Sequence, residues 1–389
     1  QKFRKHIIGI DQEIATPYHD AIKLIYADWT ASGRLYNLIE DKMRYEIYPL
    51  VANTHTETSH TGMTMTYAYH KAQQIIKKHV GANEHDVLIA CGSGMTNAVN
   101  KLQRILGLKL HERFRDKIDI NEDDRPIIFV THMEHHSNQT SWCETIADVV
   151  VIPPCGEGLV DLKAFQELIK QFQNRKTKIA AITSCSNVTG IFTPYQEIAK
   201  IIHQADGYCF VDFACSAPYI DINMHEDDAD GKYLDAIYFS PHKFLGGPGS
   251  SGVLLFNEKL YENKIPDHPG GGTVDWTNPW GEHKYVDNIE AREDGGTPPF
   301  LQTIRTAMCC QLKNEMGVEN IHQREEELLN IIWRKLDQIP NLHILGNSHR
   351  NRLGVISFYI DGLHYNLGVK MLKDHFGIQV RGGCSCAGT

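Results

Sequence analysis

Short apolar runs alternate with helix-like segments over residues 80–260, and this rhythm is the main structural signal in the chain. Short runs rich in β-branched side chains are typical of buried strands, whereas apolar residues that recur every three or four positions indicate helices. Strands that are apolar on both faces and joined by helices form a largely parallel sheet covered on both sides. The pattern therefore predicts an α/β fold that binds ligands at the carboxyl ends of its strands. The expected strands are 86–90, 126–131, 149–152, 178–183, 208–212, 234–240 and 252–256, and the expected helices include 95–107, 161–174 and 194–205.

This rhythm stops near residue 260. Residues 260–300 are dense in Gly, Pro, Trp and charged residues, which predicts ordered loops. After Pro299, two long helical patterns are followed by a strand, a helix and another strand, and this order predicts a small α+β domain. The expected elements there are helices 300–316, 318–336 and 364–376 and strands 354–360 and 378–381.

Composition and charge narrow the class of protein. A chain of 389 residues with 42% hydrophobic and 22% charged residues is expected to be a globular protein of about two domains. The net charge of −9, with no run of Lys or Arg, argues against a nucleic-acid partner. No apolar stretch approaches the ~20 residues of a membrane span and no signal-peptide pattern opens the chain, so we expect no membrane association and a cytoplasmic location. The ten scattered cysteines are typical of reduced thiols rather than of a disulfide framework.

A glycine loop after the first expected strand is a candidate anion site. Ser93, Gly94 and Met95 precede a helical pattern, and backbone N–H groups at a helix N-terminus can bind a phosphate. The loop lacks the GxxxxGK[ST] pattern, and Asn97 stands where GxGxxG has its third glycine. A plain tight turn remains the alternative interpretation.

Asp212 and Lys243 each stand at the end of an apolar run. Taken singly, Asp212 is equally consistent with a helix cap or a buried ion pair, and Lys243 with a lysine that reaches solvent. Together they match pyridoxal phosphate (PLP), which needs a lysine imine, a carboxylate on its pyridinium nitrogen and a phosphate site. Ser240, His242 and the Ser93 loop can supply that site, and the glycines after Lys243 let the backbone pass close to it.

A series of motifs follows along the chain in the order GSG, THMEHHSNQTSW, SCSNVTGIFTP, VDFACSAPY, SPHKFLGGPG, REDGGTPP and VRGGCSCAG. This series resembles the class V aminotransferase family of fold-type I PLP-dependent enzymes, and within it the cysteine desulfurase and selenocysteine lyase branch. The resemblance implies a large PLP-binding domain over 36–298 with a mainly parallel seven-stranded sheet, and a small α+β domain over 299–389. It also implies that the N-terminal segment 1–35 packs with the small domain, and that two chains form a homodimer with active sites at the subunit interface.

The resemblance assigns cofactor roles to the residues that match these motifs. Lys243 is implied to form the imine, Asp212 to pair with the pyridinium nitrogen and His135 to stack on the ring. Asn187 is implied to bond the phenolic oxygen of the ring or the substrate. The phosphate is implied to lie against Ser93, Gly94, Met95, Ser240 and His242, with Thr297 reaching it from the other subunit.

Substrate and sulfur roles fall on two further motifs. Asn53 and His55 occupy the family's motif at the substrate mouth, and Arg381 opens the late cysteine motif, where we expect it to face the substrate and favour a thiolate. In that motif Cys386 matches the sulfur-accepting cysteine, and Cys384 stands where a histidine is common. The implied reaction converts L-cysteine, or its selenium analogue, to L-alanine and leaves a persulfide on Cys386, from which an acceptor protein can take the sulfur.

Departures from the family pattern leave other interpretations open. Cys215 stands where the family often has a glutamine that touches the ring substituent, and the arginine that usually grips the substrate carboxylate would follow residue 389. If the late cysteines are bystanders, the chain is an aminotransferase or an amino-acid epimerase of the same fold. A non-catalytic metal or persulfide carrier is the alternative from another class. The histidines lack HExxH spacing and the C-x-C pair has no second pair nearby, so we expect no metal site.

Overall fold

A seven-stranded sheet forms the centre of the protein, whose computed structural model describes residues 2–54, 58–115 and 117–387. The strand order is β4-β12-β11-β8-β7-β5-β6. Strand β12 runs antiparallel to both of its neighbours, and the other neighbouring pairs are parallel. The predicted α/β fold with a mainly parallel sheet is therefore confirmed. The strands are β4 (Asp86–Cys91), β5 (Ile127–Thr131), β6 (Asp148–Ile152), β7 (Lys178–Thr183), β8 (Tyr208–Asp212), β11 (Ala236–Phe239) and β12 (Gly252–Asn257).

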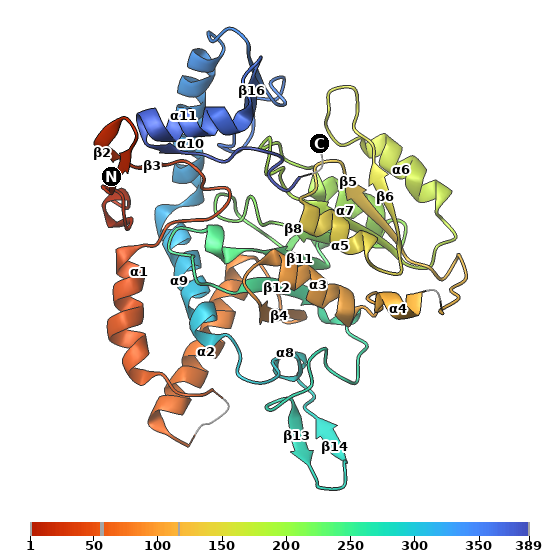
Figure 1. Ribbon diagram of the computed structural model, residues 1–389. Coiled ribbons are helices and arrows are strands. Elements are labelled where there is room, and N and C mark those ends of the chain that lie inside the picture. The colour runs from red at the N-terminus through yellow and green to blue at the C-terminus, as the bar shows by residue number, and fades with distance from the viewer. Residues whose placement is uncertain (1, 55–57, 116, 388–389) are drawn as a thin grey trace.

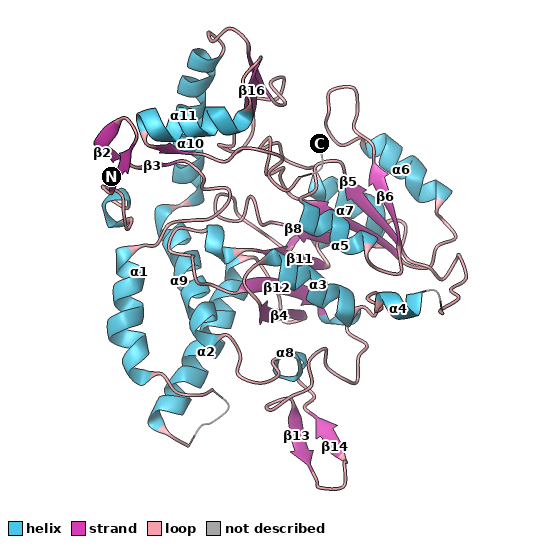
Figure 2. Ribbon diagram, in the orientation of Figure 1, coloured by secondary structure: helices cyan, strands magenta, loops and turns pink. Residues whose placement is uncertain are grey.

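Two apolar cores lie on opposite faces of this sheet. Alternate residues of a strand point to opposite faces, so Ile127 and Phe129 enter one core while Ile128 and Val130 enter the other. Helices α2, α6, α7 and α9 contribute to the first core, and α3 and α5 contribute to the second. Figure 2 shows these helices covering both sides of the strands, which explains why the strands are apolar throughout.

The helices account for most of the remaining chain. In the part of the chain that the structure describes, no helix is both long enough and apolar enough to cross a membrane. The α-helices are α1 (Asn37–Lys42), α2 (His60–His79), α3 (Met95–Ile105), α4 (Glu112–Arg115), α5 (His136–Cys143), α6 (Leu162–Gln171), α7 (Tyr195–His203), α8 (Ile289–Glu293), α9 (Phe300–Met316), α10 (Val318–Leu336) and α11 (Tyr365–Phe376). Short helical turns are η1 (Arg4–His6), η2 (Met43–Ile47), η3 (Tyr48–Leu50), η4 (Asp228–Asp230), η5 (Pro241–Lys243) and η6 (Glu258–Leu260).

Segments from the N-terminal and C-terminal regions pair with each other beside α11. Strand β17 from the C-terminal region pairs in parallel with β3 from the N-terminal region, and Thr16 Oγ1 donates a hydrogen bond to the carbonyl of Asp374 at 2.8 Å. Figure 1 shows the N-terminus beside β2 and β3 in this region, whereas the chain runs on from here to end beside β5. The strands here are β1 (Glu13–Thr16), β2 (His19–Lys23), β3 (Ile25–Tyr26), β15 (Leu342–Ile344), β16 (Phe358–Ile360) and β17 (Ile378–Gln379).

A small hairpin occupies the segment that the sequence predicts as loops. Strands β13 (Val274–Thr277) and β14 (His283–Tyr285) pair antiparallel and project away from the sheet in Figure 1. Their side chains are mostly exposed, so the apolar pattern that marks a buried strand is missing. The prediction of loops was therefore wrong for these residues.

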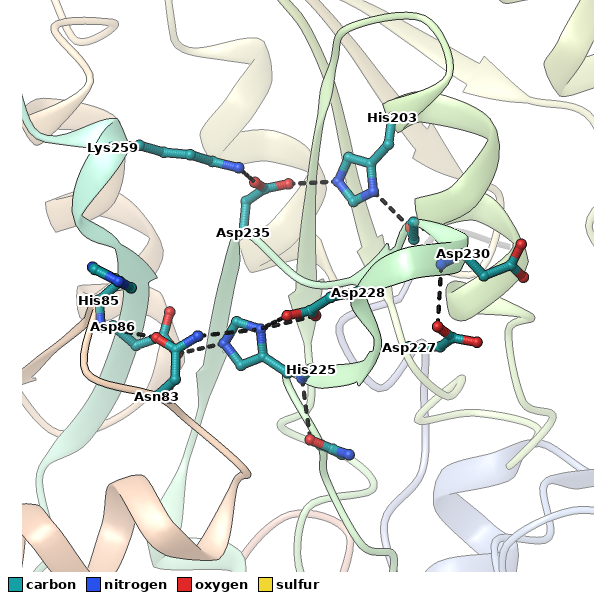
Figure 3. A network of polar contacts seen from close by, with 12 residues as sticks. Asn83, His85, Asp86, His203, His225, Asp227, Asp228, Asp230, Asp235 and Lys259 are labelled. Carbon is teal, nitrogen blue, oxygen red and sulfur yellow. Dashed lines mark hydrogen bonds and ion pairs between the residues drawn. The ribbon is translucent and has the colours of Figure 1, made fainter.

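Figure 3 shows a polar network at the amino ends of β4 and β11. This edge of the sheet is opposite the one at which Asp212 ends β8 and Lys243 follows β11. His225 of β9 (His225–Asp227), which pairs with β10 (Lys232–Tyr233), lies 2.7 Å from Asp86 at the start of β4. Asp235, just before β11, lies 2.8 Å from His203 and 2.6 Å from Lys259. The network therefore fastens this edge of the sheet to the segments around it.

Candidate active site

The two charged residues predicted to face one cofactor follow neighbouring parallel strands. Asp212 ends β8, and Lys243 ends the short turn η5 that follows β11. Asp212 is in register with Tyr238 of β11. Both charged residues therefore lie at the carboxyl edge of the sheet, where α/β folds bind ligands.

The carboxyl of Asp212 is buried, with only 2% of the residue exposed. Its Oδ1 accepts a hydrogen bond from the N–H of Ala214 at 2.8 Å. Burial raises the pKa of Asp212 to about 6, although this hydrogen bond and the positive charge of Lys243 oppose the rise. A cation placed against Asp212 would lower its pKa again, so the site is suited to a protonated ring nitrogen.

The glycines near Lys243 are required by close backbone contacts. A Cβ atom on Gly247 would lie 1.9 Å from the carbonyl oxygen of Pro241, and one on Gly33 would lie 2.0 Å from a backbone oxygen just after Lys243. The N–H of Gly33 also donates to the carbonyl of His242 at 2.9 Å. The turn that presents Lys243 is thus fixed from both sides. Gly33 was missed in the sequence, because its signal there is a lone glycine in a loop.

A helix N-terminus and the lysine turn together form the predicted anion site. Helix α3 begins at Met95, whose N–H donates to Ser240 Oγ at 2.9 Å. A Cβ atom on Gly94 would lie 3.0 Å from Ser240 Oγ and 3.7 Å from His242 Nε2, so any larger residue would fill the space between them. Burial, followed by the charge of the adjacent lysine, lowers the pKa of His242. Ser93 is exposed in the same loop, so the structure brings the five predicted phosphate residues together.

His135 caps the N-terminus of α5 with its ring. Its Nδ1 accepts a hydrogen bond from the N–H of Ser137 at 3.1 Å. Burial and then the charge of Lys243 lower the pKa of His135 to about 4. The ring is therefore neutral at pH 7, which suits the predicted stacking on an aromatic cofactor.

A buried carboxylate on the loop between β5 and α5 was not identified as a site residue from the sequence. Glu134 accepts hydrogen bonds from the N–H and hydroxyl of Thr131, at 3.1 and 2.6 Å, and from the N–H of Thr183 at 2.9 Å. It also accepts from Asn138 Nδ2 at 2.7 Å, and Asn138 accepts from the hydroxyl of Tyr238 at 2.6 Å. Burial raises the pKa of Glu134 to about 7 against these hydrogen bonds. The network links β5, β7, α5 and β11 next to the candidate site.

The cysteine segment near the C-terminus folds into a tight turn. The N–H of Ala387 donates to the carbonyl of Cys384 at 3.1 Å, and the central residues Ser385 and Cys386 have φ angles of 51° and 55°. Two left-handed central residues are typical of a type I′ turn, which favours Asn and Gly. For residues with a Cβ atom this conformation costs on the order of 1 kcal/mol each, so other contacts must hold it. Both cysteines are exposed.

Two hydrogen bonds fasten this turn to the candidate site. Asn187 Nδ2 donates to the carbonyl of Ser385 at 2.8 Å, and the N–H of His136 donates to the carbonyl of Cys386 at 2.7 Å. An isolated β-bridge joins the same segment to His135, and Figure 1 shows the end of the chain beside β5 and α5. The structure therefore brings the late cysteine motif next to residues that the sequence places around the cofactor.

Asn187 keeps one atom without a partner. Its Oδ1 is buried and accepts no hydrogen bond from any residue that the structure describes. A buried acceptor without a donor is costly, so this atom marks a place for a donor group on a ligand. The predicted contact with the phenolic oxygen of the cofactor remains a prediction.

In the described part of the chain, no hydrogen bond or ion pair joins the remaining predicted residues to Asp212 or Lys243. Arg381 is exposed and forms an ion pair with Asp28 at 3.3 Å. Asn53 is exposed in the loop before α2, and His55 lies outside the described residues. Thr297 is exposed on the loop before α9 and lines a cavity of about 270 Å³. Its contact with a second subunit's phosphate, and the substrate roles of the other three, remain predictions.

The residues present fit PLP. Asp212 and Lys243 supply the acid and the amine, Gly94 leaves the anion site open, and Asn187 Oδ1 lacks a donor. Cys215 lies three residues after Asp212, buried and within reach of the charge of Lys243. Over the ranges the structure describes, no three His, Cys, Asp or Glu side chains are grouped so as to hold a metal ion.

The fold and this site define an α/β enzyme of the fold-type I PLP-dependent class. The chain belongs to the aminotransferase class-V family, whose sequence profile matches residues 25–389. A probable cysteine desulfurase from Staphylococcus aureus is 30% identical over 373 residues, which cover 94% of this chain and 83% of the relative. A probable cysteine desulfurase from Synechocystis is 27% identical, over 93% of this chain and 82% of the relative. The chain is therefore a cysteine desulfurase-like enzyme of a PLP-dependent family.

Solved structures share the fold. A cysteine desulfurase from Thermococcus onnurineus superposes with a TM-score of 0.76 at 24% identity, covering 96% of this chain and 89% of that chain. A cysteine desulfurase from Escherichia coli superposes with a TM-score of 0.77 at 20% identity, covering 99% of this chain and 88% of that chain. At these identities the likeness concerns the fold alone.

Proposed function

We propose that this enzyme is a PLP-dependent cysteine desulfurase that converts L-cysteine to L-alanine, with selenocysteine as the alternative substrate. The observation that carries the proposal is the fastening of the turn over residues 384–387. Asn187 and His136 hold the carbonyls of Ser385 and Cys386, so an exposed thiol segment is held beside the residues that we propose bind the cofactor. An aminotransferase or an epimerase has no chemical need for thiols there. The names of the relatives from Staphylococcus aureus and Synechocystis agree with the proposal.

We propose that PLP binds between Asp212 and Lys243. When bound, PLP would act as an electron sink for negative charge at the substrate Cα. The amine of Lys243 would take and return the Cα proton, and Asp212 would keep a proton on the pyridine nitrogen. The neutral ring of His135 would pack against the cofactor. The N-terminus of α3, with Ser240 and His242, would bind the phosphate.

The sulfur step would use Cys386. Its thiolate would attack the sulfur of the substrate, so that a persulfide S–S bond forms while the substrate Cβ–S bond breaks. The electron pair of the broken bond stays on the substrate, and protonation at Cβ completes alanine. A thiol of an acceptor protein would then take the sulfur from Cys386. The cysteines of the structure are free thiols, which fits the reduced cytoplasm where we propose that the enzyme acts.

The test is incubation of the purified, PLP-loaded protein with L-cysteine and simultaneous assay of sulfide and alanine. We expect equal amounts of both in the presence of a reducing thiol, and a large loss of both in Cys386→Ala. If Cys386→Ala keeps the parental rate without added thiol, the desulfurase proposal is wrong. If Cys384→Ala is the damaging change instead, the nucleophile is the other cysteine of the turn. Formation of a keto acid or of D-cysteine without sulfide would favour the aminotransferase or epimerase alternatives.

We also propose that the enzyme is a homodimer. Large apolar side chains are exposed along residues 38–67, from α1 into α2, and a patch of this kind is typical of a protein interface. The exposed side chains are Leu38, Tyr45, Tyr48, Val51, Met63 and Tyr67.

A further inference from the structure

Two buried cysteines lie side by side at the ends of β7 and β8. Cys185 follows β7 and Cys215 follows β8, and they are 0% and 5% exposed. Their sulfur atoms lie 3.7 and 3.8 Å from the same atom, the carbonyl oxygen of Ser186. Both belong to one apolar cluster with Leu353, so the two side chains are packed together away from solvent.

The two strand ends are fastened to each other, which holds the thiols in this arrangement. The N–H and the hydroxyl of Ser184 donate to the carbonyl of Asp212 at 2.9 and 3.0 Å. The hydroxyls of Ser184 and Ser216 lie 2.6 Å apart. Cys215 is thus joined, three residues along the chain, to Asp212 of the candidate active site.

The two thiols differ in their electrostatic surroundings. A hydrogen bond from Cys185 lowers the pKa of Cys215 despite burial, and the charge of Lys243 acts in the same direction. Burial and the same hydrogen bond raise the pKa of Cys185. Cys215 is therefore the more acidic thiol of the pair, which is the order expected between an attacking thiol and a resolving thiol.

We propose that Cys185 and Cys215 are an oxidisable dithiol, a modification site for peroxides built into the wall of the PLP site. The sulfur of Cys215 attacks an oxygen of hydrogen peroxide, which gives a sulfenic acid and releases water. The thiol of Cys185 then displaces the hydroxyl as a second water and forms a disulfide, so the two thiols lose two electrons to the peroxide.

Closure of this disulfide changes the cofactor site. A disulfide holds its sulfur atoms about 2.05 Å apart, closer than any hydrogen-bonded pair of thiols. The segment from Asp212 to Cys215 must shift to reach this distance, so PLP binding weakens. This consequence rests on the proposed function, whereas formation of the disulfide does not.

The first test maps the disulfide itself. The native protein is treated with hydrogen peroxide, the remaining thiols are blocked, and the peptides are analysed by mass spectrometry. We expect a linked pair of peptides that contain Cys185 and Cys215, with the loss of two hydrogens, and their separation by dithiothreitol. Cys309 and Cys310 are the matched control, because burial raises the pKa of both and we expect both to stay reduced. The proposal would be overturned if Cys185 and Cys215 stayed reduced in protein whose exposed cysteines had been oxidised.

The second test follows PLP uptake by visible absorbance before and after peroxide, in the parent protein and in Cys185→Ala and Cys185→Ser. We expect the oxidised parent protein to lose uptake and to recover it with dithiothreitol. Both variants stop at the sulfenic acid of Cys215 and cannot pull the segment from Asp212 to Cys215 into a disulfide, so we expect them to lose less uptake than the parent. A disulfide that forms without changing uptake would overturn the link to the site. Reduced protein that never takes up PLP would contradict the proposed function instead, and the peptide map would still decide on the dithiol.

Discussion

The carboxyl of Glu134 shows how much a single buried residue contributes to the shape of the site. Its two oxygens accept four hydrogen bonds, from Thr131, Thr183 and Asn138, and hold the loop that carries His135. A buried carboxylate is tolerated when hydrogen-bond donors surround its oxygens. A side chain that places a donor among those donors leaves them without an acceptor and is destabilising.

We therefore expect Glu134→Gln to destabilise the protein by about 1–3 kcal/mol, because its amide N–H₂ would face the N–H groups that Glu134 now accepts from. Denaturant unfolding measures this change. Glu327→Gln is the matched control, since Glu327 pairs with Arg324 on the surface and such pairs contribute little. Equal stability of the parent and Glu134→Gln would contradict this account of the network.

The raised pKa of Asp212 gives the cofactor-free protein a dependence on pH. The folded state holds the proton of Asp212 more tightly than the unfolded chain, so the resulting stability is complete below about pH 4 and is lost as the pH rises through about 6. We expect Asp212→Asn to remove this part of the pH profile and to stabilise the cofactor-free protein at pH 7 by on the order of 2 kcal/mol. Unfolding curves between pH 4 and 8 test this, and parallel profiles for both proteins would contradict it.

At the scale of elements, the turn over residues 384–387 is the part under strain. Ser385 occupies a left-handed position that Asn adopts readily and that β-branched residues adopt with difficulty. The hydrogen bond from His136 to the carbonyl of Cys386 reports whether the turn is docked.

We expect Ser385→Asn to slow hydrogen exchange at the amide of His136 and Ser385→Val to speed it. The exchange rate should change by up to about tenfold for each 1.4 kcal/mol by which a substitution changes the stability of the turn. Exchange measured by NMR or by mass spectrometry checks this order. The amide of Thr183, bonded to Glu134, is an internal reference that should not change. Identical exchange at His136 in the two variants would show that the turn stores no strain.

The polar network at the amino edge of the sheet is a second element with a pH signature (Figure 3). Burial lowers the pKa of His225, but the hydrogen bond and charge of Asp86, together with Asp228, outweigh burial and raise it. The contribution of His225 to stability is therefore complete below about pH 6.5 and is lost as the pH rises through the raised value.

We expect His225→Gln to flatten the fall in unfolding free energy between pH 6 and 8. His343→Gln, which removes a histidine from an exposed pair with Asp361, serves as the control and should leave the profile unchanged. A parental slope in His225→Gln would contradict the assignment.

The elements that the sequence predicts well are strands buried on both faces and long helices with a clear apolar pattern. Strands β7 and β8 and helices α9 and α10 have the bounds that the apolar pattern predicts. Strands β1, β2 and β3 were missed because they are short and largely exposed, and because β3 pairs with β17 from the opposite end of the chain. A pattern read along the chain carries no information on such a distant partner.

The same limit applies to the site. Asp212 and Lys243 could be predicted because each interrupts an apolar run where a parallel strand ends. Glu134 and Gly33 act through hydrogen bonds and close backbone contacts to distant segments, and a local pattern does not show these. The partner of Cys215, Cys185, was missed for the same reason.

At the scale of the whole molecule, the exposed apolar side chains from Leu38 of α1 to Tyr67 of α2 predict the dimer interface. We expect Tyr67→Glu to shift the protein from dimer to monomer mass in light scattering, because a charge would be buried against an apolar partner surface. Tyr359→Glu is the control, since Tyr359 is exposed on β16 and lies away from this patch. A monomeric parent protein would contradict the proposed homodimer.

The central claim is that Cys386 receives sulfur at a site built around Asp212 and Lys243. The most direct measurement is to mix the PLP-loaded enzyme with one equivalent of L-cysteine in the absence of other thiols, trap the products with an alkylating agent and map the sulfur by mass spectrometry. The account predicts one extra sulfur atom on the peptide that contains Cys386, together with an equal amount of alanine, and neither in Lys243→Ala. Alanine formed with no extra sulfur on Cys386 or Cys384 would contradict it.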